Sequence, residues 1–271
     1  SNYVNQKYAS EIYFYYAEAV EQADDSELEQ AWADAVQYNE SITPGAIEET
    51  ELFSQEALEE AADNYENLLN ITGNGIMGYV EIPIINVNLP IYHGTGNDSL
   101  ERGVGHLLGS SLPVGGNSTH SILTGHSGMA TNKMFSDLER VKEGDIFYLH
   151  ILGETLAYQV SELNTVLPHD TSLLGIIPDE DCCTLVTCVP YAVNSHRLLV
   201  RGERIPYKEA EELVEEITVE EMPTSQWEEK YFEGIFWGLL IASVMTAAII
   251  AFSITRRPKR RKRRGGKYVR K

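Results

Sequence analysis

The chain has 271 residues, 43% of them hydrophobic, which is enough to bury one ordinary core. Its 41 acidic residues against 21 basic ones favour solubility and attract cationic partners, without identifying one. Its three cysteines exclude a framework in which every thiol is paired within the chain. The sequence starts at Ser1 with neither a basic nor an apolar leader, so we expect a processed or truncated chain that once carried an export signal.

Residues 1–70 are rich in Ala, Glu, Gln and Tyr and are predicted to be a helical region. Apolar residues recur at spacings of three and four in ASEIYFYYAEAVEQA (9–23) and SQEALEEAADNYENLLN (54–70), which predicts two helices. Ser54 is placed to cap the second. Between them, Pro44 and Gly45 predict an irregular surface segment.

From Gly75 the pattern changes to period two with many β-branched residues, which predicts short strands. The predicted strand segments are 76–94, 118–125, 144–152, 154–167, 183–189 and 196–205. Turn residues separate them, and short helices are expected at 98–102 and 135–140. We therefore predict a mainly β domain over residues 71–206, an antiparallel sheet closed into a barrel or sandwich.

The C-terminal part is predicted to be membrane-associated. Residues 207–233 form an acidic helix or stalk, and residues 234–254 are 21 positions without a charge, long enough for a transmembrane helix. Residues 255–271 carry 11 Lys or Arg and no acid, so this tail should be cytoplasmic and everything before the span extracellular. A topology signal with anionic-lipid contact is favoured over nucleic-acid binding, because the tail directly follows the span.

Three residues could form a catalytic site. Cys188 ends a predicted strand, and Arg197 lies on the next one, so the two can face each other if residues 191–196 are the intervening loop. The Arg197 guanidinium could then stabilise an oxyanion. His126, in a strand-to-loop turn of the segment ILTGHSG, is the best acid or base. Taken singly, each Cys or His is more often a structural residue.

Together these residues resemble the signature of sortases, the membrane-bound cysteine transpeptidases of Gram-positive cell surfaces. The matching motifs are TLVTC ending at Cys188, HRLLVRGE containing Arg197 and LTGHSG containing His126. Further similar stretches are 75–94, 103–116, 118–128 and 134–152, so the resemblance covers about residues 68–205. The segment PYAVNSHRLLVRG and the C-terminal span resemble class C, the pilus-polymerising branch of the family.

The resemblance implies a closed sortase-type β-barrel and a two-step acyl transfer without metal or organic cofactor. Cys188 would attack the Thr carbonyl of a sorting signal similar to Leu-Pro-x-Thr-Gly (LPXTG) and form a thioacyl enzyme. His126 would be the general acid and base, and Arg197 would bind substrate and stabilise the oxyanion. The class C acceptor is a Lys amine on the next pilin subunit, so pilins and a membrane are the implied partners and nucleic acid is not.

The sequence departs from class C in the region where a lid is expected, about residues 41–55. The Asp-Pro-aromatic motif of such lids is missing from TPGAIEETELFSQE, where Phe53 is the candidate for the covering aromatic. Phe53 could equally be a hydrophobic staple for the helix after Ser54. Both readings stay open.

The remaining thiols and histidines receive weaker assignments. Cys182 and Cys183 are expected to pack as small apolar residues, since a bridge to Cys188 would block catalysis. His120 is the main rival to His126, although it lies inside a predicted strand, and His196 should point away from the Arg197 face. A zinc site is rejected, because neither CxxC nor HxxxH spacing occurs.

Three functions follow from these observations. The first is a pilin-polymerising transpeptidase, and the second is a sortase that attaches proteins to a peptidoglycan amine with the same barrel and the same three residues. The third is a non-catalytic, membrane-tethered pilus scaffold or adhesin. The joint presence of Cys188, His126 and Arg197 disfavours the third, because a binding module has no need of all three.

Overall fold

The computed structural model describes residues 2–42, 64–127, 134–191, 193–218, 235–240 and 243. Contacts divide the chain into two compact units, residues 1–227 and 228–271. In the second unit, residues 235–240 are helical. Within the described part of the chain, no helix has both the length and the apolar character needed to cross a membrane, and most of the predicted span 234–254 lies outside that part.

The first unit is a closed barrel of eight strands in the order β1-β2-β3-β4-β7-β8-β6-β5. The strands are β1 (Ile76–Ile82), β2 (Val87–His93), β3 (Val104–His106), β4 (Thr119–Thr124), β5 (Ile146–Ile151), β6 (Glu154–Val166), β7 (Asp181–Val189) and β8 (His196–Ile205). Alternate residues point into the barrel and form one continuous core, in which the aromatic rings of Phe147 and Tyr158 are stacked 5.4 Å apart. The barrel prediction is confirmed.

The sheet is mixed, so the prediction of a wholly antiparallel sheet was wrong. Strand β2 runs parallel to β3, and β4 runs parallel to β7, while the other neighbouring pairs are antiparallel. A parallel pair needs a long crossover connection. In the second case this connection contains β5 and β6, so β7 returns to the barrel beside β4.

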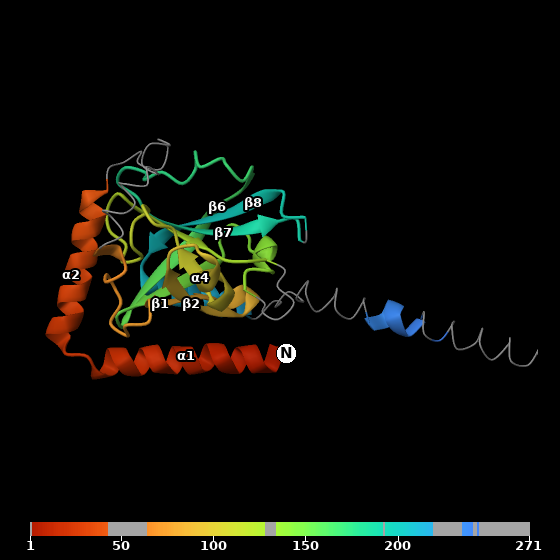
Figure 1. The fold of residues 1–271 in the computed structure, drawn as a ribbon. Coiled ribbons are helices and arrows are strands. Elements are labelled where there is room, and N and C mark those ends of the chain that lie inside the picture. The colour runs from red at the N-terminus through yellow and green to blue at the C-terminus, as the bar shows by residue number, and fades with distance from the viewer. Residues whose placement is uncertain are drawn as a thin grey trace, which may run out of the picture. The chain divides into compact units, whose positions relative to one another are not determined.

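Two N-terminal helices, α1 (Asn2–Gln22) and α2 (Asp25–Ser41), lie outside the barrel (Figure 1). In α1, the Tyr16 hydroxyl donates to the Met77 carbonyl at 2.9 Å and accepts from the Leu152 amide at 2.9 Å. In α2, the buried Asn39 amide exchanges two hydrogen bonds with the Leu112 backbone. Both helices are thereby held to parts of the barrel far away in the sequence, α1 to strand β1 and the residue after β5, and α2 to the segment between β3 and β4.

The sequence predicted α1 but not α2. Helix α2 has a clear start signal, since the Asp24 side chain accepts from the Ser26 amide and two acids occupy the first turn. Most of the predicted helix at 54–70 lies outside the described residues. In the described remainder, Asn64 and Tyr65 are helical and residues 66–69 form a turn. The lid candidate Phe53 also lies outside them.

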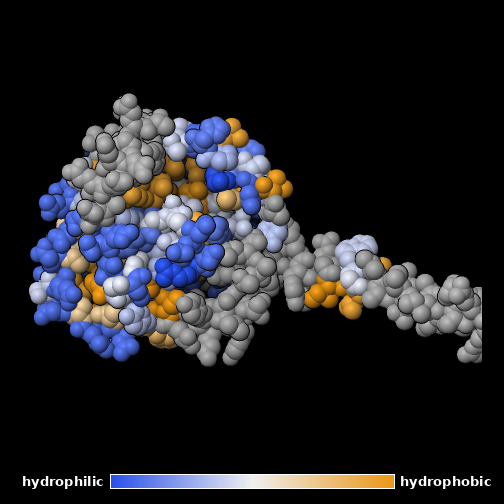
Figure 2. All heavy atoms as spheres, viewed as in Figure 1, coloured by the Kyte–Doolittle hydropathy of each residue, from blue (hydrophilic) through white to orange (hydrophobic). Residues whose placement is uncertain are grey.

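Short helices complete the unit: η1 (Pro83–Ile85), α4 (Asn97–Arg102), η2 (Leu138–Arg140) and α5 (Tyr207–Thr218). Helix α4 matches a predicted short helix, and η2 forms the last turn of another. Helix α5 begins the predicted acidic stalk and packs Ala210, Leu213 and Val214 against Ile146 and Tyr148 of the barrel. On the face shown in Figure 2, hydrophilic side chains predominate and apolar ones gather between them in a few places.

Candidate active site

The antiparallel pairing of β7 and β8 places Cys188 directly opposite Arg197. Side chains of directly opposed residues point to the same face of a sheet. Both residues are half-buried, and the cysteine is a free thiol. The predicted facing of these two residues across neighbouring strands is confirmed.

The face that carries Cys188 is the outer face of the barrel. Cys183, Leu185 and Val189 of β7 belong to the interior core, so by period two Cys188 shares the opposite face with Val186. The Val186 side chain belongs to a small cluster of buried apolar residues on this outer face: Ile122, Leu174, Val186 and Leu199. The thiol therefore lies on the same face as an apolar cluster to which β4, β7 and β8 contribute.

His126 comes two residues after the end of β4, at the same end of the barrel as Cys188. The Gly125 amide donates to the Val186 carbonyl at 2.9 Å, and the Ser127 hydroxyl donates to the Cys188 carbonyl at 2.5 Å. His126 itself is half-buried. The structure thus brings all three residues predicted for catalysis to one edge of the β4–β7–β8 sheet.

Arg197 is held by the loop that joins β7 to β8. Its Nη1 donates to the His196 carbonyl at 3.1 Å and to the Asn194 carbonyl at 3.3 Å. Five N–H donors project from a guanidinium, so these two bonds leave others for a substrate carbonyl or an oxyanion.

His120, the rival base, is fully buried, and both of its ring nitrogens are engaged. Its Nδ1 lies 2.7 Å from the Gly175 carbonyl oxygen, and its Nε2 lies 2.7 Å from the Thr184 hydroxyl. Burial lowers the pKa of this imidazole. It has no exposed surface with which to reach a substrate, which favours His126 as the acid and base.

Cys182 and Cys183 are buried, free thiols, as predicted. Burial raises the pKa of Cys182 to about 12 and that of Cys183 well above its ordinary value. The thiolate is the reactive form of cysteine, so neither is a better candidate nucleophile than Cys188. His196 pairs with Val189, an interior residue, and so points away from the Cys188 face. Among the described residues there is no group of His, Cys, Asp or Glu suited to hold a metal.

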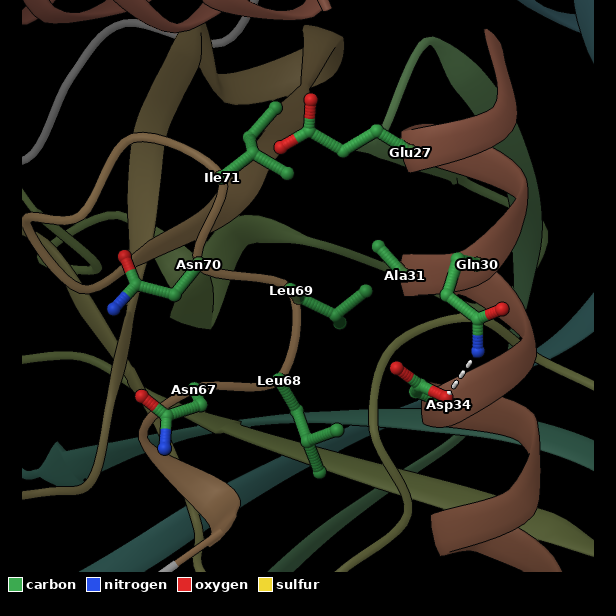
Figure 3. Close-up of a pocket in the computed structure, with 9 residues that line it drawn as sticks. All are labelled: Glu27, Gln30, Ala31, Asp34, Asn67, Leu68, Leu69, Asn70 and Ile71. Carbon is green, nitrogen blue, oxygen red and sulfur yellow. Dashed lines mark hydrogen bonds between the residues drawn. The ribbon is translucent and has the colours of Figure 1, made fainter. Parts of the chain in front are cut away.

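Two pockets line α2 and involve none of the three predicted catalytic residues. One, of about 310 Å³, lies between α2 and residues 67–71. Figure 3 shows Leu69 pointing toward Ala31 while Asn67 and Asn70 point away from the helix. The other, of about 600 Å³, lies between α2 and the β5–β6 hairpin. They are gaps where the helix packs on the barrel.

Sequence reasoning missed the two hydroxyl residues that join the site segments, Ser127 and Thr187. The Thr187 hydroxyl donates to the Gly125 carbonyl at 2.8 Å. Each stands next to a predicted catalytic residue in the motifs TGHS and TC. That adjacency was the only available signal, because the partners are 61 and 62 residues away along the chain.

Comparison with known proteins assigns the family. Residues 80–205 match the sortase domain. The fold is similar to that of sortase C from Streptococcus pneumoniae, with 45% identity, a TM-score of 0.64 and coverage of 73% of this chain and 97% of that one. The chain belongs to the sortase family.

Other relatives agree. Sortase C1 of Streptococcus agalactiae has 43% identity and a TM-score of 0.65, covering 72% of this chain and 98% of that one. Sortase A of Streptococcus agalactiae serotype III (strain NEM316) is 33% identical over 135 residues, 47% of this chain and 52% of the relative. The chain therefore spans about half the length of this curated relative. Sortases are cysteine transpeptidases of the cell surface or membrane, and the family prediction is confirmed.

Proposed function

We propose that this sortase cleaves an LPXTG-like sorting signal through a thioacyl intermediate on Cys188 and joins it to a Lys amine of the next pilin subunit. The observation that supports this most is the direct pairing of Cys188 with Arg197, with the His126 segment hydrogen-bonded to the same strand. The Cys188 nucleophile, the Arg197 guanidinium and the His126 acid–base group then lie at one end of the barrel.

In the first step, the Cys188 sulfur attacks the carbonyl carbon of the signal's Thr. Negative charge develops on the carbonyl oxygen, and the Arg197 guanidinium stabilises it. The carbon–nitrogen bond to Gly breaks as the protonated His126 imidazole gives its proton to the leaving amine. The product is a thioester on Cys188 with a neutral imidazole beside it.

In the second step, a Lys amine attacks the thioester carbonyl, and His126 takes a proton from the amine. The carbon–sulfur bond breaks, an isopeptide bond forms, and the Cys188 thiolate and His126 imidazolium are restored. All protons move between side chains and substrates. The scheme uses no metal and no organic cofactor.

The pilin acceptor is supported by the similar solved structures. The Streptococcus pneumoniae sortase C has been described in terms of pilin substrate specificity, and a similar sortase C1 comes from a streptococcal pilus island. The strongly acidic chain also suits approach of a cationic Lys.

We further propose how the segments of the chain are arranged at the cell surface. Residues 1–70 form a helical region with a lid at about 41–55 that carries Phe53, and residues 71–206 form the extracellular catalytic barrel. Residues 207–233 act as a stalk to a span at 234–254, with residues 255–271 in the cytoplasm.

The test incubates the full chain with an LPXTG peptide and purified pilin and records intact mass over time. We expect a thioacyl adduct that is lost in Cys188→Ala and kept in Cys182→Ala, a matched change at a buried thiol on the same strand. Products larger than the pilin monomer should follow. Resolution of the adduct only by peptidoglycan-like amines would favour wall anchoring, and absence of any adduct would favour a non-catalytic scaffold.

A further inference from the structure

Three hydrogen bonds join the segment around His126 to strand β7. The Gly125 amide donates to the Val186 carbonyl at 2.9 Å, and the Thr187 hydroxyl donates back to the Gly125 carbonyl at 2.8 Å. The third is the Ser127 hydroxyl, which donates to the Cys188 carbonyl at 2.5 Å. The residues on both sides of His126 are thus attached to three consecutive residues of the nucleophile's strand.

The Ser127 bond fills a gap in the β-ladder. Carbonyls two residues apart on a strand point to the same side, so the Cys188 carbonyl points to the same edge as that of Val186. The Val186 carbonyl is satisfied by a backbone amide, whereas β4 ends at Thr124 and supplies no further ladder partner. A side-chain hydroxyl takes the place of that missing amide.

This bond acts on the position of His126 relative to the nucleophile. Gly125 fixes the backbone before His126, but Ser127 holds the backbone after it, where the chain leaves the barrel. On that side the Phe135 amide also donates to the His126 carbonyl, at 3.0 Å. Without the Ser127 hydroxyl, the segment keeps its attachment to β4 and loses its direct bond to the backbone of Cys188.

We propose that Ser127 is a positioning residue that holds the His126 imidazole at its working distance from the Cys188 sulfur. The inference rests on the proposed acyl transfer for its kinetic consequence and on the hydrogen bonds alone for its structural one. The Ser127 hydroxyl bonds to the Cys188 carbonyl and acts through the backbone of that residue.

The test compares Ser127→Ala with Ser127→Thr, which keeps the hydroxyl, in the full chain. The matched control is Ser121→Ala, which removes a buried hydroxyl on β4 that has no hydrogen-bond partner among the residues that the structure describes. Two readouts are used. One is kcat and KM for LPXTG peptide cleavage, and the other is the pH dependence of Cys188 alkylation by iodoacetamide, located by peptide mass.

We expect Ser127→Ala to lower kcat by about 10-fold to 100-fold, since misplacement of a catalytic group by an ångström costs about that much. KM should change by less than about twofold, because peptide binding does not use the hydroxyl. The alkylation curve should move to higher pH, since a displaced imidazolium stabilises the thiolate less. Ser127→Thr should restore both readouts, and Ser121→Ala should match the wild type.

The inference is overturned if Ser127→Ala matches Ser121→Ala in both readouts, or if Ser127→Thr is as impaired as Ser127→Ala while folded by circular dichroism. The alkylation readout needs no peptide. If the wild type cleaves no sorting signal, the proposed function fails, and the shift in alkylation still decides whether Ser127 positions His126.

Discussion

Replacing Gly125 by Ala tests how tightly the His126 segment is packed. A Cβ at this position would lie 2.6 Å from Cδ2 and 2.9 Å from Cγ of the Phe135 ring. Carbon atoms in contact prefer about 3.5 to 4.0 Å, so the overlap is on the order of 1 Å. Phe135 is fully buried and cannot turn into open space.

Overpacking of this kind costs about 1 to 3 kcal/mol, which we expect as the loss in the free energy of unfolding, measured with urea. Relief requires the ring or the 125–126 backbone to move. Because the Phe135 amide also bonds to the His126 carbonyl, either movement shifts the imidazole, and peptide cleavage should slow by about 10-fold or more.

Gly175→Ala is the matched control, since a Cβ there meets no atom within 4 Å and the backbone is not left-handed. Its stability should stay within about 0.5 kcal/mol of the wild type. Adding Phe135→Leu to Gly125→Ala should recover part of the loss by making room. The reasoning is refuted if Gly125→Ala unfolds at the same urea concentration as Gly175→Ala and cleaves peptide at the wild-type rate.

Two further predictions concern stability. Burial lowers the pKa of His106 from 6.5 to about 4 in the folded chain, so between these pH values the unfolded chain binds a proton that the folded chain does not. The free energy of unfolding is therefore not reduced by this group above pH 6.5, and it falls by about 3 kcal/mol as the pH falls to 4. His106→Gln should lack this part of the slope in urea unfolding between these pH values, and an unchanged slope would contradict it. Asn39→Ala removes the acceptor of the Leu112 amide, while the Leu112 carbonyl keeps its bond from the Val114 amide, and should cost about 1 to 3 kcal/mol, whereas Gln37→Ala, exposed on the same helix, should cost under about 0.5 kcal/mol. Equal thermal midpoints for the two variants would rule out this role for Asn39.

The strands were predictable where alternation extended over enough residues. Strand β3 was missed because Val104–His106 is too short for any period to show. The parallel pairing of β4 with β7 was missed for another reason. Alternation along a strand reports which face is buried, and the direction of its neighbour depends on the connection between them.

The candidate site was predictable to the extent that it is local. Cys188 and Arg197 stand on consecutive strands, so their pairing follows from one short loop. The bond from Ser127 to Cys188 joins residues 61 apart, and no spacing rule reaches that far. His120 was a credible rival until its two hydrogen bonds and complete burial were visible.

The parallel pairing of β4 with β7 also governs when the site can form. The β7–β8 hairpin closes over a few residues, whereas β4 meets β7 only after β5 and β6 have been placed between them in sequence. Contacts at such separation are slow to form during folding. Pairing of the thiol with Arg197 therefore needs only the local hairpin, whereas its approach to the His126 segment needs the strands in between to be in place. Closure of the barrel is what brings the three candidate residues together.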